Sequence, residues 1–133
     1  MPSSRQLARN PQLTEYTVQD LNLVPTLPYE DSSFDFCLNV VSVDYLTRPL
    51  EVFDEMHRVL RPGGTAIMSF SNRCFPTKAI TMWGQTDDAG HLWIVGSYFR
   101  FSGRGRGGWF NRKAVDISGH GDPMWVVQGS TPG

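Results

Sequence analysis

The stretch from Phe34 to Phe70 constrains the fold of this chain most strongly. Its first part, Phe34–Val43, is mostly apolar and rich in β-branched residues, which is typical of a strand covered on both faces. Apolar residues then recur at helical spacing, at Val52, Phe53, Met56, Val59 and Leu60. The run Pro62-Gly63-Gly64 ends this helix, and Thr65–Phe70 is a second apolar strand. Strand, helix and strand in this order predict a right-handed βαβ unit.

The segments on either side extend this unit into a larger sheet. Thr14–Leu21 alternates apolar with polar residues and is predicted to be a strand, with Asp20 at its end. Helices are also predicted at Ser3–Arg9, Phe75–Trp83 and His91–Phe101, and the last two could be separate or continuous. A hairpin is predicted from the two short strands Ala114–Ser118 and Met124–Gln128. The whole pattern predicts one α/β domain over residues 1–133. Its three layers would enclose a mostly parallel sheet with an antiparallel C-terminal hairpin.

Composition excludes several classes of protein. The chain has 133 residues and a formal net charge of −1, which argues against nucleic-acid binding, including binding through the arginines of Gly103–Gly108. It contains no apolar run long enough to cross a membrane and begins without a secretion signal. The two cysteines, Cys37 and Cys74, are far apart and are expected to be reduced thiols of a cytoplasmic protein. No histidine or cysteine spacing indicates a metal site.

Two short runs carry a resemblance to a known family. They are Leu27–Phe36, which reads LPYEDSSFDF, and Arg58–Gly64, which reads RVLRPGG. At this separation they resemble the second half of a class I S-adenosylmethionine-dependent methyltransferase, most of all the ubiquinone and menaquinone biosynthesis group. The resemblance covers residues 14–128 and implies a partial Rossmann-like sheet. It also implies the strand order 3-2-1-4-5-7-6 with strand 7 antiparallel, of which this chain would supply strands 3 to 7.

The resemblance also implies site residues. Asp20 matches the acidic residue that accepts a hydrogen bond from the adenine amino group of S-adenosylmethionine, although it could simply be a turn residue. The other positions implied to border the cofactor are Leu21, Asn39, Val40 and Val41, and Asn39 could equally be a satisfied polar group within a strand. Candidates for the side of the methyl acceptor follow the two inner strands: Asp44, Tyr45, Asn72 and Arg73. Asp44 could also only cap a turn, and no catalytic residue is identified.

One part of the family pattern is missing from this sequence. The family has a glycine-rich loop after strand 1, which holds the methionine portion of the cofactor, and an acidic residue after strand 2 that holds the ribose. The chain begins just before strand 3, and Gly103–Gly108 opens no helix that could replace the loop. The strand Phe34–Val43 would therefore have a bare edge. Three outcomes are expected: a truncated chain, a homodimer joined through this edge, or direct pairing of Thr14–Leu21 with Phe34–Val43.

Two functions remain open at this point. The first is a methyltransferase-like protein, with a small-molecule acceptor in the intact family, that is not expected to be active alone. The second is a non-catalytic oligomerising module derived from a methyltransferase, in which the bare strand edge is the site of interaction.

Overall fold

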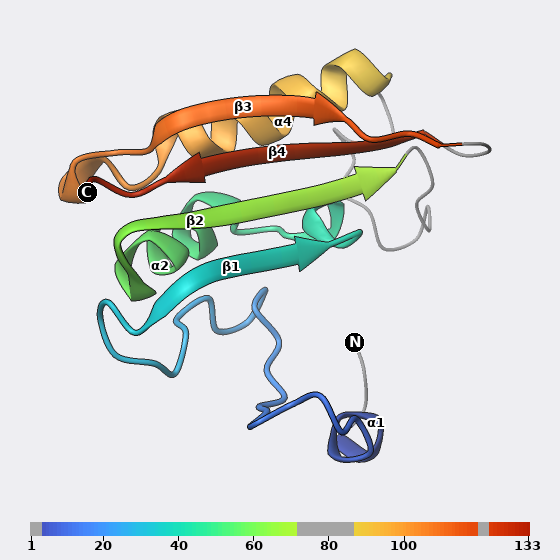
Figure 1. The fold of residues 1–133 in the computed structure, drawn as a ribbon, viewed down its shortest axis with the longest axis vertical. Helices are drawn as coiled ribbons and strands as arrows, with labels where there is room; N and C mark the ends of the chain where they lie inside the picture. Colours follow the sequence, from blue (N-terminus) through green and yellow to red (C-terminus); the bar gives the residue numbers. More distant parts are fainter. Residues whose placement is uncertain (1–3, 72–86, 120–122) are drawn as a thin grey trace.

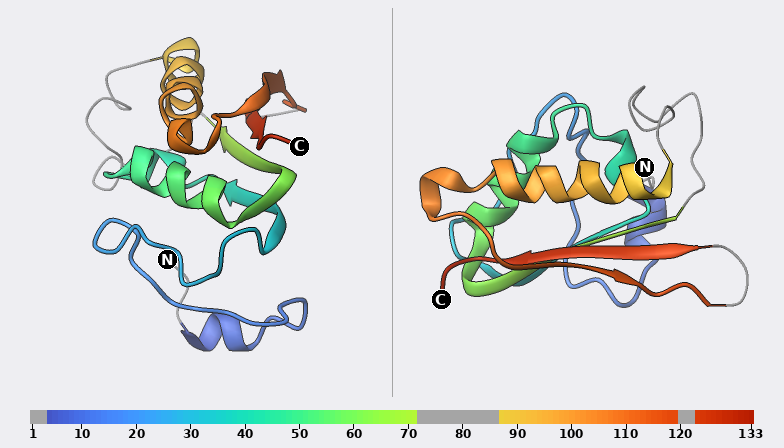
Figure 2. Two further views of the ribbon diagram at one scale, coloured as in Figure 1. Left: turned by 90° about the vertical axis from the view of Figure 1, so that its left-hand side faces the viewer. Right: turned by 90° about the horizontal axis from the view of Figure 1, so that it is seen from above.

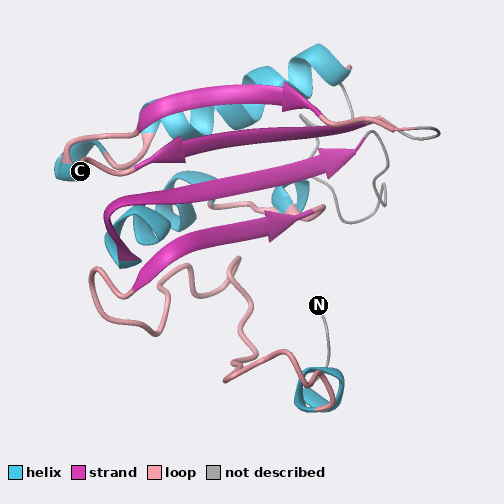
Figure 3. Ribbon diagram, viewed as in Figure 1, coloured by secondary structure: helices cyan, strands magenta, loops and turns pink. Residues whose placement is uncertain are grey.

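A computed structural model describes residues 4–71, 87–119 and 123–133. The elements follow one another along the chain in the order α1 (Ser4–Ala8), β1 (Phe34–Val40), η1 (Val43–Tyr45), α2 (Pro49–Val59), β2 (Leu60–Ser71), α4 (Asp88–Phe101), η2 (Arg104–Arg106), β3 (Phe110–Asp116) and β4 (Met124–Ser130). Figures 1 and 3 show the four strands as one twisted sheet. The predicted helix Phe75–Trp83 and the thiol of Cys74 lie outside the described residues.

The sheet has the strand order β1-β2-β4-β3. β1 and β2 pair in parallel, whereas β4 is antiparallel to both β2 and β3. Three strands therefore share one direction and β4 alone runs against them. This is the 4-5-7-6 part of the order that the resemblance implies, and it confirms both the α/β class and the antiparallel C-terminal hairpin.

The βαβ unit forms because α2 is amphipathic and ends abruptly. Pro49 stands at the start of α2, where its missing N–H costs no hydrogen bond, and Arg48 pairs with Glu51 in the first turn. Leu60 is already extended, so the chain passes directly from α2 into β2. Gly64 allows this close turn, because a Cβ there would lie 2.9 Å from the carbonyl oxygen of Arg61. The helix predicted from the apolar spacing is confirmed.

The core lies between the helices and one face of the sheet. Every second residue of β2 points into it, with Ala66, Met68 and Phe70 almost fully buried. From α2 and α4, Phe53 and Phe99 meet these strands, and their rings contact each other at 5.0 Å between centroids. Figure 2 shows α2 and α4 on the same side of the sheet.

The third layer that the sequence predicts is not present in the part of the chain that the structure describes. Phe36, Leu38 and Val40 project from the other face of β1, and each is more than 60% exposed. Apolar residues on both faces of β1 led to the prediction of cover on both sides, but the described helices cover only one.

The predicted strand Thr14–Leu21 is wrong. The segment has no strand pairing and its residues up to Val18 are exposed. Its end folds into a turn, in which the Asp20 carbonyl oxygen accepts the N–H groups of Leu23 and Val24. A strand needs a neighbouring strand as its partner, and none of the described strands lies beside this segment. Without that partner its backbone groups are satisfied locally or by water instead. Direct pairing with β1 is also contradicted, since β1 pairs with β2 alone among the described strands.

Two further findings concern membrane-spanning helices and metal sites. Within residues 4–71, 87–119 and 123–133, no helix combines the length and the apolar character that crossing a bilayer requires. The same residues contain no cluster of side chains suited to a metal ion.

Candidate functional site

The candidate site lies where β1 ends, at the edge of the sheet where ligands bind in open α/β folds. The chain turns sharply here. The Val41 N–H still donates to Ser69 at 2.8 Å, but Val41 has a φ of +47°, which is strained for a β-branched residue. Val40 and Val41 are exposed at this end. The Ser42 hydroxyl donates to Asn39 Oδ1 at 2.9 Å. Asn39 thus has the contact of a satisfied strand amide, and its role toward a cofactor stays a prediction.

The turn that carries Asp20 and Leu21 is fastened beside this strand end. Asn22 holds it there through both ends of its side-chain amide: Nδ2 donates to the Tyr45 carbonyl oxygen at 3.0 Å, and Oδ1 accepts the Thr47 N–H at 2.9 Å. Leu21 packs against the core, while Asp20 remains exposed. The structure therefore brings the Asp20 turn next to η1, although the strand predicted to carry it does not form.

Asn22 was not identified from the sequence. The signal available was its position directly after Asp20-Leu21, in a residue type whose side chain both donates and accepts. The Asp20 carboxylate shapes the turn itself, because its Oδ1 accepts the Asn22 N–H at 2.9 Å. The alternative of Asp20 as a turn residue is consistent with this contact. Its second carboxylate oxygen makes no hydrogen bond to a residue that the structure describes, and an exposed acceptor of this kind suits an adenine amino group.

Asp44 is the buried polar group of the site. Its side chain is only 3% exposed, within η1, and its Oδ2 has no hydrogen-bond partner among the described residues. Burial raises the pKa of the Asp44 carboxyl, while the nearby charge of His91 acts in the opposite direction. His91 lies in the first turn of α4 and is also buried. The structure thus brings together two titratable side chains that lie 47 residues apart in the sequence.

Replacing Asp44 by asparagine is expected to stabilise the protein at pH 7. A raised pKa means that the folded state binds the proton more tightly than the unfolded state, so stability is lost as the pH rises through the raised pKa. Asparagine has the same shape without the charge. We expect a gain of about 4 °C in Tm at pH 7. This corresponds to removing the roughly 1 kcal/mol of folding free energy that burial of the Asp44 carboxylate costs. The gain should shrink as the pH falls toward the ordinary carboxyl value of 3.8, where Asp44 is protonated.

Thermal unfolding followed by circular dichroism across this pH range measures the effect. The control is Glu30→Gln, which removes an exposed carboxylate and is expected to leave Tm within about 1 °C. A lower Tm for Asp44→Asn at pH 7 would contradict the prediction, because it would mean that attraction to His91 outweighs the cost of burial.

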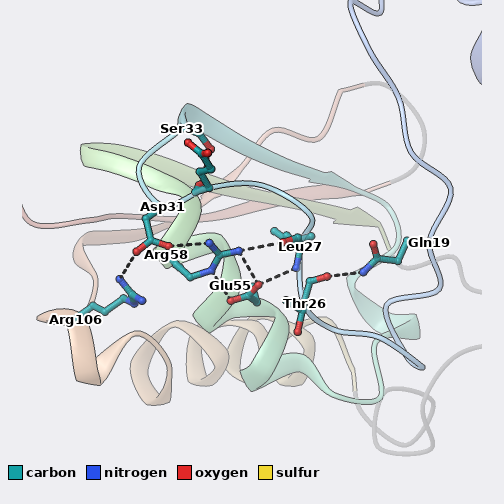
Figure 4. A network of polar contacts seen from close by, with 9 residues as sticks. Gln19, Thr26, Leu27, Asp31, Ser33, Glu55, Arg58 and Arg106 are labelled. Carbon is teal, nitrogen blue, oxygen red and sulfur yellow. Dashed lines mark hydrogen bonds and ion pairs between the residues drawn. The ribbon is translucent and has the colours of Figure 1, made fainter.

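A separate network of charges holds the segment before β1 in place. Arg58 of α2 is its centre: Nε donates to Glu55 at 2.8 Å, Nη1 to Asp31 at 2.8 Å and Nη2 to the Leu27 carbonyl oxygen at 3.0 Å (Figure 4). Glu55 in turn accepts the Leu27 N–H at 2.8 Å. The hydrogen bonds from Arg58 lower the pKa values of both Glu55 and Asp31. This network and Asn22 together position the Asp20 turn.

The structure does not gather all the predicted site residues. Asn72 and Arg73 lie outside the described residues, so their proximity to Asp44 and Tyr45 stays a prediction. A groove of about 640 Å³ opens between the start of α2 and the end of α4, and its walls are mainly Leu46, Pro49, Leu50, Tyr98 and Phe101. Among the predicted site residues that the structure describes, none lines this groove. The groups at the end of β1 that are available for binding or catalysis are therefore exposed side chains and the buried carboxyl of Asp44.

Comparison with known proteins identifies the family. A family model described as a methyltransferase domain matches residues 1–68. An uncharacterized methyltransferase of Mycobacteroides abscessus is 33% identical over 105 residues, which cover 79% of this chain and 33% of that protein. The biotin biosynthesis bifunctional protein BioHC of Teredinibacter turnerae is 33% identical over 67 residues, which cover 50% of this chain and 12% of that protein.

The fold leads to the same group of proteins. The crystal structure of an S-adenosylmethionine-dependent methyltransferase from Mesorhizobium loti superimposes with a TM-score of 0.60 at 15% identity, covering 96% of this chain and 77% of that one. This chain spans a third or less of the curated relatives described above. S-adenosylmethionine is by resemblance the cofactor of the family. The matched family and the 4-5-7-6 order of the sheet together place this chain among the class I S-adenosylmethionine-dependent methyltransferases.

Proposed function

We propose that this chain forms the adenosine side and the acceptor side of a methyltransferase that acts on a small molecule. The observation that carries the proposal is the position of the Asp20 turn, which Asn22 fastens to Tyr45 and Thr47 beside the end of β1. The exposed Asp20 carboxylate there forms no ion pair with any residue that the structure describes. The nearby Val40 and Val41 add exposed apolar surface against which an aromatic base can lie.

The residues present fit one half of the cofactor. Asp20 would accept a hydrogen bond from the adenine amino group, and Leu21, Val40 and Val41 would contact the base. The first glycine of the chain is Gly63, which lies after β1 and α2, so no glycine-rich loop precedes this site within the sequence. The methionine half would need groups from elsewhere. The ubiquinone-like subgroup and the nature of the acceptor remain part of this proposal.

The chemistry needs positioning more than it needs an acid or base. S-adenosylmethionine supplies a methyl group on a positively charged sulfur, which is transferred by in-line displacement when an acceptor is held in line with it. On the acceptor side, Asp44 and Tyr45 would orient the acceptor, together with Asn72 and Arg73. A buried carboxyl with a raised pKa, as at Asp44, suits an acceptor that must lose a proton.

Calorimetric titration with S-adenosylhomocysteine tests the cofactor half of the proposal. We expect the 133-residue chain to bind this product with a dissociation constant in the millimolar range, since only one half of the pocket is present. Asp20→Asn should weaken binding about tenfold, because a hydrogen bond to a charged group contributes roughly 1.5 kcal/mol.

The matched control is Asp35→Asn, an exposed carboxylate at the opposite end of β1. It should leave the dissociation constant unchanged within about twofold. Absence of binding at millimolar concentration would contradict the proposal that this chain holds adenosine by itself. An equal effect of the two substitutions would show that Asp20 acts only through general charge.

A second candidate function is a non-catalytic oligomerising module. The observation that favours it is the exposed apolar row Phe36, Leu38 and Val40 on a strand with only one described neighbour. Light scattering at high protein concentration separates the two candidates in part, since a strict monomer would contradict the oligomerising module and leave the cofactor proposal intact.

A further inference from the structure

The outer edge of β3 is unpaired among the described strands. β3 stands at the end of the sheet beyond β4, and all of its residues are exposed (Figure 1). In the strand order 3-2-1-4-5-7-6 that the resemblance implies, β3 takes the place of strand 6, which is last. It is therefore an edge of the whole fold, unlike the edge of β1, beside which this order places a further strand. A strand edge of this kind is a template for pairing with another chain.

Alternate residues of β3 point their backbone groups away from β4. The Ile117 N–H donates inward to the Met124 carbonyl oxygen at 2.9 Å, and the antiparallel register continues this inward pattern at Val115 and Lys113. Because the direction alternates along a strand, the N–H and C=O groups of the residues in between point outward. These outward-pointing residues are Arg112, Ala114 and Asp116.

The regular part of this edge is short. The register of β3 against β4 shifts between Phe110 and Lys113, and Asn111 has a φ of +51°, so a β-bulge interrupts the strand there. At its other end the strand stops at Asp116. A partner can therefore pair regularly only with Arg112–Asp116.

The two ends of this short stretch carry opposite charges. Arg112 and Asp116 flank Ala114, which lies opposite the buried Val127 of β4, so all three side chains lie on the face of the sheet that the helices cover. Both charged residues are exposed, and neither forms an ion pair with a residue that the structure describes. Hydrogen bonds from Ser118 lower the pKa of Asp116, so its carboxylate stays charged at pH 7.

We propose that two copies of this chain join β3 to β3 in antiparallel fashion, about a twofold axis at Ala114. In this register Arg112 lies opposite the partner's Asp116, and Asp116 lies opposite the partner's Arg112, so an ion pair forms on each side of the axis. The outward-pointing residues of the two strands then exchange hydrogen bonds. On the other face of the sheet, Lys113 lies opposite the partner's Val115, so no two like charges are directly opposed.

Charge selects this register over its neighbours. An axis at Lys113 would place the two Lys113 side chains directly against each other, which is unfavourable. An axis at Val115 would place Asp116 opposite the partner's Ala114 and leave both charges without an opposite partner. An interface built on one short strand lies at the small end of specific interfaces. We therefore expect a reversible dimer with a dissociation constant on the order of ten micromolar.

Two single substitutions test the pairing of Arg112 with Asp116. Arg112→Asp opposes two carboxylates on each side of the axis, and Asp116→Arg opposes two guanidinium groups. Sedimentation equilibrium should show that each substitution raises the dissociation constant by about tenfold or more. The matched control is Arg104→Asp, which makes the same change of charge at an exposed arginine outside β3. It should change the constant by less than about twofold.

Mixing the two variants tests the register itself. A chain with Arg112→Asp and a chain with Asp116→Arg regain an opposite charge on each side of the axis when they pair with each other. An equimolar mixture should therefore dimerise to within about threefold of the unsubstituted chain, although each variant alone does not. Circular dichroism of each variant should match that of the unsubstituted chain, so that unfolding does not account for the loss of the dimer.

Three results would overturn the proposal. They are an unsubstituted chain that stays monomeric at about 1 mM, single variants that dimerise as well as Arg104→Asp, and a mixture of folded variants that does not dimerise. Leu38→Lys, in the exposed row of β1, should leave the dimer intact, and its loss would assign the interface to β1 instead. The proposal does not depend on cofactor binding, so titration with S-adenosylhomocysteine and sedimentation can each fail without the other.

Discussion

Phe53→Ala is expected to lower the free energy of unfolding by about 3–5 kcal/mol, the largest effect of any single substitution proposed here. Phe53 is fully buried, and its ring packs between α2 and α4. It meets Phe99 at 5.0 Å and Tyr98 at 5.5 Å between centroids, both in edge-to-face arrangement. Removing the ring leaves a cavity that two helices on one side of a sheet cannot close. Domains of this size are stable by only about 5–15 kcal/mol, so partial unfolding at 37 °C is expected.

Urea denaturation followed by circular dichroism measures this loss. The matched control is Leu50→Ala, on the same helix but 42% exposed, for which a change within about 0.5 kcal/mol is expected. Phe53→Leu should fall between the two, because it keeps most of the apolar volume. A loss below about 1.5 kcal/mol for Phe53→Ala would contradict the view that the two helices depend on this contact.

The elements with strong local signals were predictable from the sequence. The helix α2 follows from apolar residues at helical spacing and a Pro-Gly-Gly stop, and β1 and β2 follow from their apolar runs. The hairpin of β3 and β4 follows from two short apolar segments with a turn between them. The order of the four strands, in contrast, came from the family resemblance, because periodicity does not specify which strands become neighbours.

The failures concern contacts between distant parts of the chain. Thr14–Leu21 has the alternation of a strand, but a strand forms only beside a partner, and none of the described strands pairs with it. Arg58 stands four residues after Asp54, a spacing at which opposite charges pair along a helix. It bonds instead to Glu55 and to Asp31, which lies 27 residues away. Local spacing could not distinguish these partners, since all of them are carboxylates within reach of a long side chain.

The sequence predicts candidate residues for the site, but it does not predict the contacts that hold them in place. The resemblance singled out Asp20, and the rule that ligands bind at the carboxyl ends of strands singled out Asp44. The structure places both near the end of β1, one in the Asp20 turn and one in η1. The amide of Asn22 joins the two segments across 23 residues, and the sequence indicates it only by its position directly after Asp20-Leu21. The role of each predicted residue toward S-adenosylmethionine remains to be tested by the binding experiment above.

Gly103→Ala is expected to destabilise the protein by about 3 kcal/mol, the second largest effect. Gly103 has a φ of +67°, a conformation that costs alanine roughly 1 kcal/mol. An added Cβ would also lie only 2.5 Å from His57 Cδ2 and 3.1 Å from Trp109 Nε1. Neither ring can move freely, because His57 and Trp109 are both buried and contact each other edge to face at 4.8 Å. The clash would therefore displace the loop and strain the Gly103 N–H···Asp54 hydrogen bond of 2.6 Å.

Gly105→Ala is the matched control, two residues away in the same loop. A Cβ at Gly105 would meet no atom within 4 Å, and its φ lies outside the left-handed region. We expect a change within about 0.5 kcal/mol in the same urea titration. The difference in the free energy of unfolding between the two variants measures the contribution of the packing of the Gly103–Gly108 run against α2. The contact of 2.6 Å between His57 Nε2 and the Gly108 carbonyl oxygen also holds this run in place. Equal effects would mean that the Gly103–Gly108 run does not pack on His57.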